Sequence, residues 1–368
     1  MNKINYIAFS AIPSVLPSSL QIVKTCDSFS KHKYNVTLIK PGTGDKRFSL
    51  KKYYGLQNSF KIKEFKFFKS FPKGLKFYLY SLCCLFFIIR SGYSVTITRN
   101  YFICYLLLLF RKKVILEIHH DINIEGRITK FIIKNSNFLN KENLINIIAI
   151  TNSVKNLFVT KYHVKPNKIK VLPSGSSMSV NQKPTCFYNR RLKIGYFGSL
   201  SLSKGIQTLV KLSKIDKEND YYIYGGTQGV INNIKKKNNY KNLFLSRAVP
   251  YANLANIMTR MDLLTIPYKK KVSSAGEVDD ISKYTSPLKL FDYLAVGKVI
   301  IASDLKVFRE VISKKNAFFV KDYENIFEWR KIIRIAKNNK KKLFIMSKNN
   351  FELSKNYEHL KRVKNYFK

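Results

Sequence analysis

Short apolar segments recur along the whole chain, and stretches with helical periodicity separate them. The segments are rich in Val, Ile, Leu and Tyr, as strands are when both faces of a parallel sheet are covered. Alternation of such strands with helices predicts an α/β protein with parallel sheets. The predicted strands are INYIAFS (4–10), NVTLI (35–39), YSVTIT (93–98), KVILEIH (113–119), NIIAIT (146–151), KIKVLP (168–173), LKIGYF (192–197), DYYIYGG (220–226), NLFLS (242–246), DLLTIP (262–267), KVIIAS (298–303) and NAFFV (316–320).

A polar stretch without periodicity, VNQKPTCFYNRR (180–191), interrupts this series. The chain has 368 residues, which is more than one hydrophobic core usually serves. We therefore predict two doubly wound lobes of similar size, with a boundary near residue 185. Ligands of such lobes bind at the carboxyl ends of the parallel strands, where loops meet helix N-termini.

The chain is strongly basic, with 67 Lys and Arg against 22 Asp and Glu, a formal net charge of +45. Such a charge favours an anionic partner: nucleic acid, an acidic membrane or a phosphorylated substrate. The codon bias of an AT-rich genome is an alternative source of part of the lysine excess. No nucleic-acid-binding motif accompanies the dispersed lysines, so we predict no nucleic-acid partner.

The cysteines and the apolar runs indicate in which cellular compartment the protein works. Five cysteines without zinc spacing fit a reducing cytosol, and two early prolines make MNKINYIAFSAIPSVLPSSL a poor secretion signal. The run Leu75 to Ile89 is too short to span a bilayer. In residues 61–82, however, lysines alternate with aromatics, which predicts docking on an anionic membrane; an ordinary buried helix with a lysine edge is the alternative.

The stretch TSPLKLFDYLAVGKVIIASDL (285–305) predicts a short helix followed by a buried strand. Thr285 and Ser286 are read as its caps, Pro287 as the first helical residue and Gly297 as the left-handed exit. The start of such a helix offers unpaired N–H groups, here from Leu288 and Lys289 (288–289), at the positive end of the helix dipole. We expect a phosphate to bind there.

IGYFGSLSLSKGIQTLV (194–210), YTSPLKLFDYLAVGKVIIASDLKVFREVI (284–312), EIHHD (117–121) and YEHLKRVKNYF (357–367) together resemble the retaining nucleotide-sugar glycosyltransferases of the GT-B fold, family-4 type. The resemblance implies two facing Rossmann-like lobes: an acceptor-side domain over 1–185, a nucleotide-sugar domain over 186–350, and a closing helix over 351–368 that returns to the first.

The resemblance also implies roles for particular residues. Lys204 would bind the donor diphosphate, and Asp292 would hold the nucleotide ribose. His119 would lie near the donor sugar, although a structural role for this histidine remains open. These three are the expected catalytic residues. The expected donor site comprises Gly198, Ser199, Lys204, Ser286, Pro287, Leu288, Lys289 and Asp292.

The chain departs from the family pattern at three positions. Tyr284 replaces the first glutamate of a paired motif, Ser199 replaces an arginine after the glycine of the phosphate loop, and Ser177 replaces an aspartate. An acidic group in the preceding loop, Glu277 with Asp279–Asp280 (279–280), could replace the missing glutamate. We predict no metal and no cofactor, because basic groups already neutralise a diphosphate.

The implied activity is transfer of a hexosyl group from a UDP- or GDP-linked sugar to a lipid-linked or glycan acceptor, with retention. Bacterial cell-surface glycan biosynthesis is the implied setting, in the cytoplasm or peripherally on the inner face of the plasma membrane. Two alternatives stay open: a catalytically silent partner subunit, which Tyr284 permits, and a basic nucleic-acid-binding protein.

Overall fold

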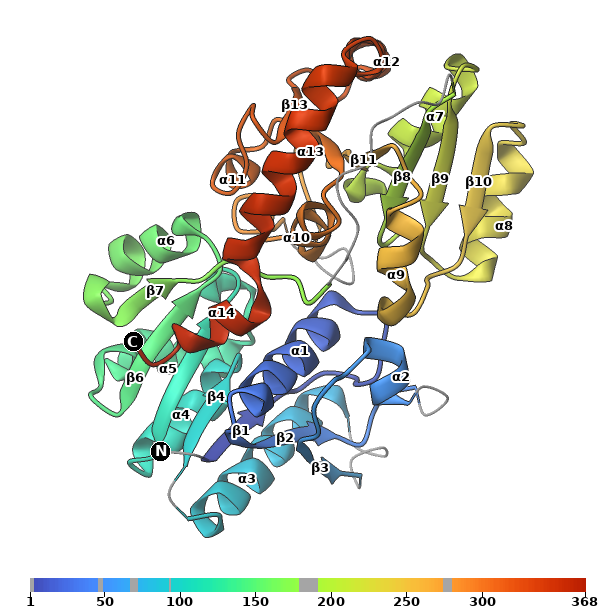
Figure 1. Cartoon of the computed structure of the whole chain (residues 1–368). Coiled ribbons are helices and arrows are strands. Elements are labelled where there is room, and N and C mark those ends of the chain that lie inside the picture. The colour runs from blue at the N-terminus through green and yellow to red at the C-terminus, as the bar shows by residue number, and fades with distance from the viewer. Residues whose placement is uncertain (1–2, 46–48, 67–71, 93, 179–190, 274–279) are drawn as a thin grey trace. The chain divides into compact units, whose positions relative to one another are not determined.

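The structure is a computed structural model that describes residues 3–45, 49–66, 72–92, 94–178, 191–273 and 280–368. The chain forms two compact units (Figure 1). Unit 1 comprises Met1–Ser174 and His359–Lys368, and unit 2 comprises Gly175–Glu358. We predicted a boundary near residue 185 and a closing helix over 351–368; the compact units divide after Ser174 and again after Glu358.

Unit 1 is built on a seven-stranded parallel sheet with the strand order β3-β2-β1-β4-β5-β6-β7. Its strands are β1 (Lys3–Ile7), β2 (Asn35–Pro41), β3 (Lys61–Phe65), β4 (Val95–Thr98), β5 (Lys113–Ile118), β6 (Leu144–Ala149) and β7 (Ile169–Val171). Its α-helices are α1 (Pro17–Lys31), α2 (Leu50–Tyr54), α3 (Lys73–Arg90), α4 (Tyr101–Leu109), α5 (Arg127–Asn135), α6 (Asn152–Tyr162) and α14 (His359–Lys364). Short 3₁₀ helices are η1 (Ile122–Ile124), η2 (Phe138–Asn140) and η3 (Pro166–Lys168).

The connections of unit 1 place its helices in two layers. The chain passes from β1 to β2 in one direction along the sheet and from β3 to β4, β5 and β6 in the other. Because parallel crossovers are right-handed, α1 covers one face of the sheet and α3, α4 and α5 cover the opposite face. The last helix of the chain, α14, packs beside α1 (Figure 1).

Every predicted strand is present, and the structure adds one, the edge strand β3. The sequence KIKEF falls within the lysine-aromatic stretch that we read as a membrane-docking segment. In the structure these residues pair in parallel with β2, and Lys40 forms an ion pair with Glu64 across the two strands. Edge strands are half solvated, so β3 lacks the continuous apolar run by which the inner strands were predicted.

Unit 2 is a six-stranded parallel sheet with the order β10-β9-β8-β11-β12-β13. Its strands are β8 (Lys193–Phe197), β9 (Asp220–Tyr224), β10 (Leu243–Ser246), β11 (Leu263–Ile266), β12 (Val299–Ser303) and β13 (Ala317–Val320). Its helices are η4 (Leu202–Lys204), α7 (Ile206–Ile215), α8 (Gln228–Lys237), α9 (Tyr251–Met258), α10 (Leu288–Ala295), α11 (Lys306–Arg309), α12 (Ile326–Lys337), α13 (Lys340–Ser354) and η5 (Lys355–Tyr357). One apolar cluster contains the fully buried Trp329 and another contains Phe291.

The structure corrects the predicted start of α10. The helix begins at Leu288, and Pro287 itself is the N-cap residue in an extended conformation, so Thr285 and Ser286 do not occupy that position. The fixed φ of proline suits this residue to the entry turn as well as to the first helical turn. Gly297 adopts the predicted left-handed conformation, with φ of 62°.

A buried ion cluster joins α14 to the centre of unit 1. Glu117 at the end of β5 forms ion pairs with Arg99, at 2.9 Å, and with Arg362 of α14, at 3.0 Å. The hydroxyl groups of Tyr6 and Tyr366 also donate hydrogen bonds to this carboxylate. Burial raises the pKa of Glu117, but the two arginines outweigh it and hold the pKa well below its usual value.

We predict that Arg362→Ala lowers the free energy of unfolding of the full chain by about 3–5 kcal/mol, because it removes one partner of a buried ion pair. Urea titration followed by circular dichroism measures this change. Lys361→Ala, on the same helix but at an exposed position, should change the free energy by less than about 0.5 kcal/mol. Equal losses for the two variants would show that the cluster does not stabilise unit 1.

Candidate functional site

Three loops of unit 2 meet at the carboxyl edge of its sheet, and their glycines permit the close approach. Gly205 follows η4 with φ of 76°, and a Cβ atom there would lie 1.6 Å from the carbonyl oxygen of Pro267, just after β11. A Cβ on Gly225, just after β9, would lie 1.8 Å from the carbonyl oxygen of Gly198, just after β8. Only residues without a side chain fit these contacts.

Lys289 extends its side chain from the first turn of α10 to the loop after β8. Its Nζ atom lies 3.9 Å from the centroid of the Tyr196 ring, and a Cβ on Gly198 would lie 2.6 Å from it. This nitrogen is buried, and within the part of the chain that the structure describes it has no hydrogen-bond partner. We expected only the backbone N–H of Lys289 to contribute to the site; the side chain was missed.

Lys204 reaches the same place from η4. Its Nζ lies 4.6 Å from the centroid of the Tyr268 ring, and Nζ of Lys289 lies 5.2 Å from that centroid. Burial lowers the pKa of Lys204 to about 8. Burial, with the added repulsion of Lys204, lowers the pKa of Lys289 well below its usual value.

Two ammonium groups thus share one aromatic ring, and no carboxylate of the described residues forms an ion pair with either of them. A buried charge without a partner is costly, which is why the pKa values fall. An anion placed between the lysines would remove that cost. The start of α10, with its N–H groups and positive dipole end, lies next to Lys289 and favours the same ligand.

Asp292 lies one turn further along α10 and is only 4% exposed. One of its carboxylate oxygens accepts hydrogen bonds from the hydroxyl groups of Ser176, at 2.6 Å, and Tyr251, at 2.8 Å. The backbone N–H of Ser177 donates to the Tyr251 hydroxyl, at 3.3 Å. Asp292 therefore connects α10 to the start of unit 2 and to α9, a structural connection that our sequence interpretation did not include.

The remaining donor-site predictions lie around these lysines. The hydroxyl group of Tyr196 donates a hydrogen bond to the carbonyl oxygen of Ser199, at 2.7 Å, which fixes the loop after β8. Ser286, Pro287 and Leu288 form the entry to α10. The acidic loop is only partly described: Glu277 and Asp279 lie outside the described residues, and Asp280 accepts hydrogen bonds from the N–H groups of residues 272 and 282.

His119 belongs to unit 1, where it follows β5. Its Nε2 atom is buried and, among the residues described, has no hydrogen-bond partner. Burial and the nearby Arg99 guanidinium lower the pKa of His119 well below its usual value, so the imidazole is neutral at physiological pH. Arg99, which our sequence interpretation missed, follows the neighbouring strand β4; a single arginine after a strand gives no signal among so many basic residues.

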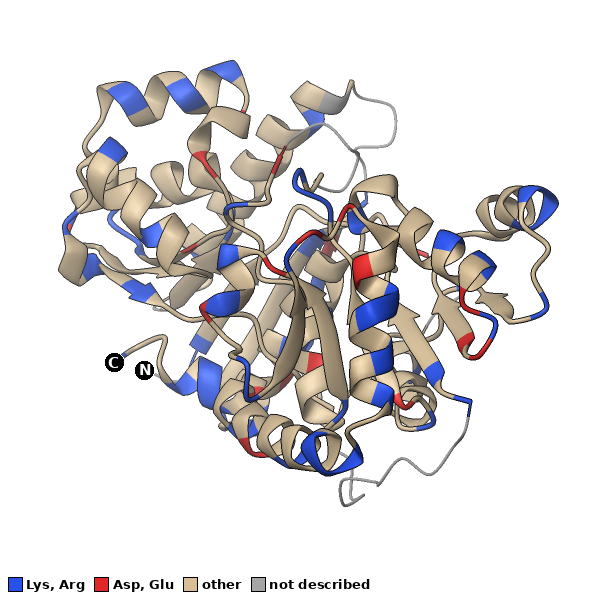
Figure 2. Cartoon of the chain, turned by 90° about the horizontal axis from the view of Figure 1, so that it is seen from above, with Lys and Arg blue, Asp and Glu red and all other residues tan. Residues whose placement is uncertain are grey.

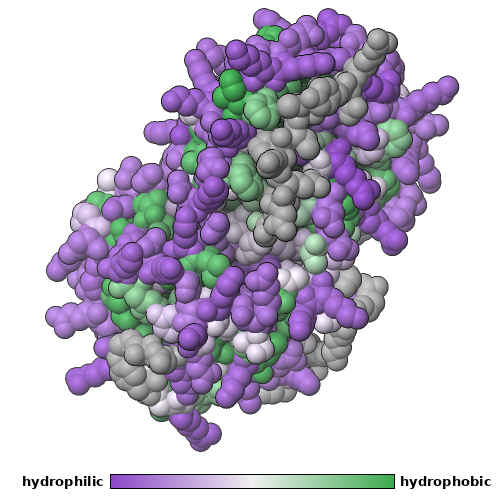
Figure 3. Space-filling view, viewed as in Figure 1, coloured by the Kyte–Doolittle hydropathy of each residue, from purple (hydrophilic) through white to green (hydrophobic). Residues whose placement is uncertain are grey.

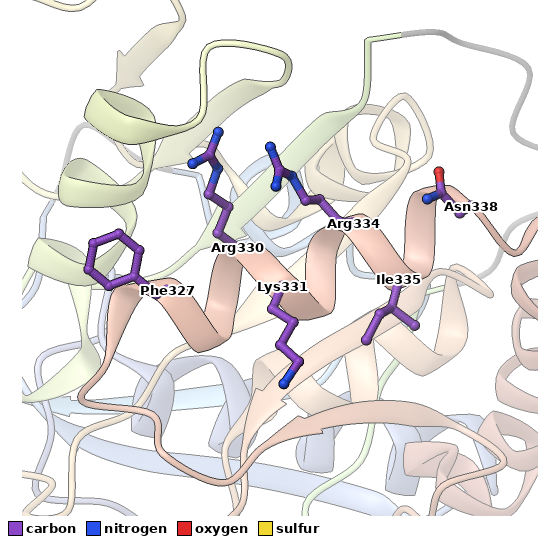
Figure 4. Close-up of a pocket in the computed structure, with 6 residues that line it drawn as sticks. All are labelled: Phe327, Arg330, Lys331, Arg334, Ile335 and Asn338. Atoms are coloured by element: carbon purple, nitrogen blue, oxygen red, sulfur yellow. The ribbon is translucent and has the colours of Figure 1, made fainter.

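A hollow of about 360 Å³ lies on the surface of α12. Figure 4 shows that five of the six lining side chains, including Phe327, Arg330 and Arg334, come from this one helix, that Asn338 directly follows it, and that the side chains point in different directions. They do not converge on a common point, so this hollow does not compete with the lysine pair as a ligand site. Within the described ranges no three His, Cys, Asp or Glu side chains gather as a metal site.

Comparison with known proteins identifies the kind of domain. The sequence model of the family "Glycosyl transferases group 1" matches residues 179–353, nearly all of unit 2 and none of unit 1. Among curated proteins, none matches this chain.

Solved structures resemble the whole chain in fold. Anabaena Alr3699/HepE with bound UDP and glucose is 12% identical, covers 99% of this chain and 97% of its own, and has a TM-score of 0.71. S. aureus TarM, solved with UDP, fondaparinux and α-GlcNAc-glycerol, is 11% identical over 100% of both chains, with a TM-score of 0.71. WaaG, a glycosyltransferase involved in lipopolysaccharide biosynthesis, is 9% identical over 98% of this chain and 97% of its own, with a TM-score of 0.66.

These findings confirm the predicted fold class: two Rossmann-like parallel lobes of the GT-B type. Together with the group 1 glycosyltransferase domain, they define the protein as an enzyme of the transferase class, a GT-B glycosyltransferase.

We predict that Gly198→Ala weakens binding of a nucleoside diphosphate at least about tenfold, because the new methyl group would lie only 2.6 Å from the Lys289 Nζ atom and displace it. Isothermal titration with UDP and GDP measures the change. Gly229→Ala is the control, since a Cβ there meets no atom within 4 Å. Unchanged binding by Gly198→Ala would mean that Lys289 does not need its observed position.

Proposed function

We propose that this enzyme transfers a hexosyl group from a UDP- or GDP-linked sugar to a lipid-linked or polysaccharide acceptor, with retention of configuration, in cell-surface glycan biosynthesis. The observation that carries the proposal is the pair of side-chain nitrogens of the half-buried Lys204 and of Lys289, whose nitrogen is buried; neither has an acidic partner among the described residues. The UDP bound in the structures of HepE and TarM supports a nucleoside diphosphate as the leaving group.

The chemistry required of the protein is mainly electrostatic. Cleavage of the bond between the sugar and the diphosphate leaves negative charge on the departing phosphate oxygen. Preorganised cations stabilise that charge more strongly in the transition state than in the bound donor, because the charge grows along the reaction. Lys204, Lys289 and the N–H groups at the start of α10 would supply this stabilisation, and no protein nucleophile is assigned.

Lys289 would perform the task of the arginine that the resemblance places at position 199. A Cβ on Gly198, the residue before Ser199, would lie 2.6 Å from the Lys289 Nζ atom. The phosphate loop therefore has a cation beside it although its own sequence lacks one. In this arrangement Ser199 and Lys289 together replace a single arginine.

Unit 1 would provide the acceptor side, with the neutral His119 near the donor sugar. Its neutral state suits a hydrogen bond to a sugar hydroxyl rather than an ionic contact. Asp292 would hold the ribose, or act indirectly by holding α10 in place. The resemblance, the lipopolysaccharide role of WaaG and the strongly basic composition support a surface-glycan acceptor at the inner face of the plasma membrane.

We predict that Lys204→Met and Lys289→Met each lower donor kcat/KM by about 10- to 150-fold, because each removes a charge-assisted hydrogen bond of about 1.5–3 kcal/mol. Part of the loss should appear in kcat, since leaving-group charge develops in the transition state. Lys236→Met, at an exposed position on α8, is the control for loss of one positive charge. Similar kinetics for Lys236→Met and the two site variants would contradict the proposed diphosphate site.

Exchange of the cation between two positions tests the role of Lys289 more sharply. Ser199→Arg should restore activity to the Lys289→Met enzyme by about tenfold or more, while the same arginine in the Lys204→Met enzyme should not. Ser199→Gln in the Lys289→Met enzyme adds a long polar side chain without the charge. Recovery with glutamine, or none with arginine, would refute the exchange.

Donor-product binding should depend on pH through these lysines. Lys204 is protonated below its pKa of about 8, and a bound diphosphate favours the protonated form, so the affinity for UDP should fall as the pH rises above 8. The limiting slope is about tenfold per pH unit for each lysine that must be protonated. Titration calorimetry between pH 7.5 and 9.5, in buffers of different ionisation enthalpy, should show proton uptake on binding, and Lys204→Met should reduce it. Affinity independent of pH over this range would contradict the assignment.

A further inference from the structure

The outer layer of unit 1 carries exposed apolar side chains that the glycosyltransferase site does not use. On α3, Leu75, Leu82, Phe86 and Ile89 are 48, 40, 60 and 37% exposed. Their spacing of seven, four and three residues places them on one side of the helix, opposite its buried residues. A stripe of this length is uncommon on a helix that already packs against a sheet.

The stripe continues onto the end of α4. Leu109 and Phe110 are 47 and 53% exposed, and α4 packs beside α3. Both helices run back to the amino edge of the sheet, where β4 and β5 begin as neighbours, so the end of α4 lies beside the end of α3. We call the six residues Leu75, Leu82, Phe86, Ile89, Leu109 and Phe110 the α3–α4 face.

The charged residues in the chain segment that carries the α3–α4 face are all basic. The sequence contains no Asp or Glu between Glu64 and Glu117, a stretch that includes both helices. Arg90 directly follows Ile89, Arg111 directly follows Phe110, and both arginines are exposed. Lys and Arg also outnumber acidic residues across the molecule (Figure 2), and hydrophilic residues cover most of the surface seen in Figure 3.

We propose that the α3–α4 face docks on an anionic lipid bilayer, with its apolar side chains among the lipid headgroups and acyl chains and Arg90 and Arg111 on the lipid phosphates. Exposed Leu, Ile and Phe with a basic rim are what a helix lying in the membrane interface presents. A second copy of the chain fits less well, because two basic rims and two charges of +45 would repel each other. No helix in the described ranges is long and apolar enough to cross a membrane, so the contact is with the surface.

This proposal moves the predicted membrane contact within unit 1. We expected residues 61–82 to dock, but residues 61–65 form the edge strand β3 and residues 67–71 lie outside the described part of the chain. The α3–α4 face lies mostly further along, over residues 82–110. The docking proposal rests on the proposed function only because a lipid-linked acceptor gives a reason for membrane docking. The test of docking needs neither donor nor acceptor.

Sedimentation of the full chain with phosphatidylcholine vesicles, with and without phosphatidylglycerol, tests the proposal. We expect binding to the anionic vesicles at low salt and little binding to the neutral ones. The double variant Phe86→Ser/Phe110→Ser should lower the partition coefficient by at least about tenfold, because two large apolar side chains no longer enter the lipid. Phe327→Ser is the matched control, since Phe327 is 64% exposed on α12 of unit 2 and should leave binding unchanged.

A second pair of variants separates the charges from the apolar contacts. Arg90→Gln/Arg111→Gln should weaken binding to anionic vesicles more than Lys235→Gln/Lys236→Gln, which removes the same charge from exposed positions on α8. Circular dichroism and melting temperature establish that each variant is folded. Equal binding of wild type to neutral and anionic vesicles, or unchanged binding by the double Phe variant, overturns the proposal. So does a concentration-dependent dimer that the double Phe variant abolishes, because the face would then join two copies.

Discussion

The close approach of the half-buried Lys204 to the buried nitrogen of Lys289 is the constraint on which the candidate site of unit 2 depends. Lys204 and Lys289 contact the same tyrosine ring, and burial together with mutual repulsion lowers the pKa of Lys289. A fold does not gain stability from such a pair in the absence of an anion. The glycines at 198, 205 and 225 allow three loops to approach closely enough to enclose it, and Tyr196 and Tyr268 supply electron-rich faces that soften the repulsion.

In unit 1, by contrast, the buried charge has partners within the protein. Glu117 has two arginine partners and two tyrosine hydroxyl groups, so its charge is compensated within the protein. This cluster has a structural task, because it attaches the last helix of the chain to the sheet. The contrast explains why charge alone does not reveal function: the paired carboxylate stabilises the fold, and the lysine pair is the proposed binding site for the donor diphosphate.

Much of the fold could be predicted from the sequence, and the failures have physical causes. Strands such as β5 and β12 are covered on both faces, so their apolar runs are unmistakable, whereas the half-solvated edge strand β3 reads as alternating lysines and aromatics. At the candidate site, Lys204 and the start of α10 were predicted from motifs. No local sequence pattern predicts the direction of the Lys289 side chain or the hydrogen bond from Tyr251 to Asp292. Both depend on packing between segments that are distant in the sequence.

The return of the C-terminus to unit 1 has a consequence for biosynthesis. Residues 359–368 complete unit 1, yet the ribosome adds them only after all of unit 2. The ion cluster of unit 1 therefore cannot form completely until Arg362 has been synthesised, 245 residues after Glu117. Unit 2 is continuous and can fold as soon as it leaves the ribosome. A nascent chain that stops before residue 359 would leave Glu117 with the Arg99 ion pair but without the Arg362 ion pair, so the centre of unit 1 would be held less firmly than in the longer chain.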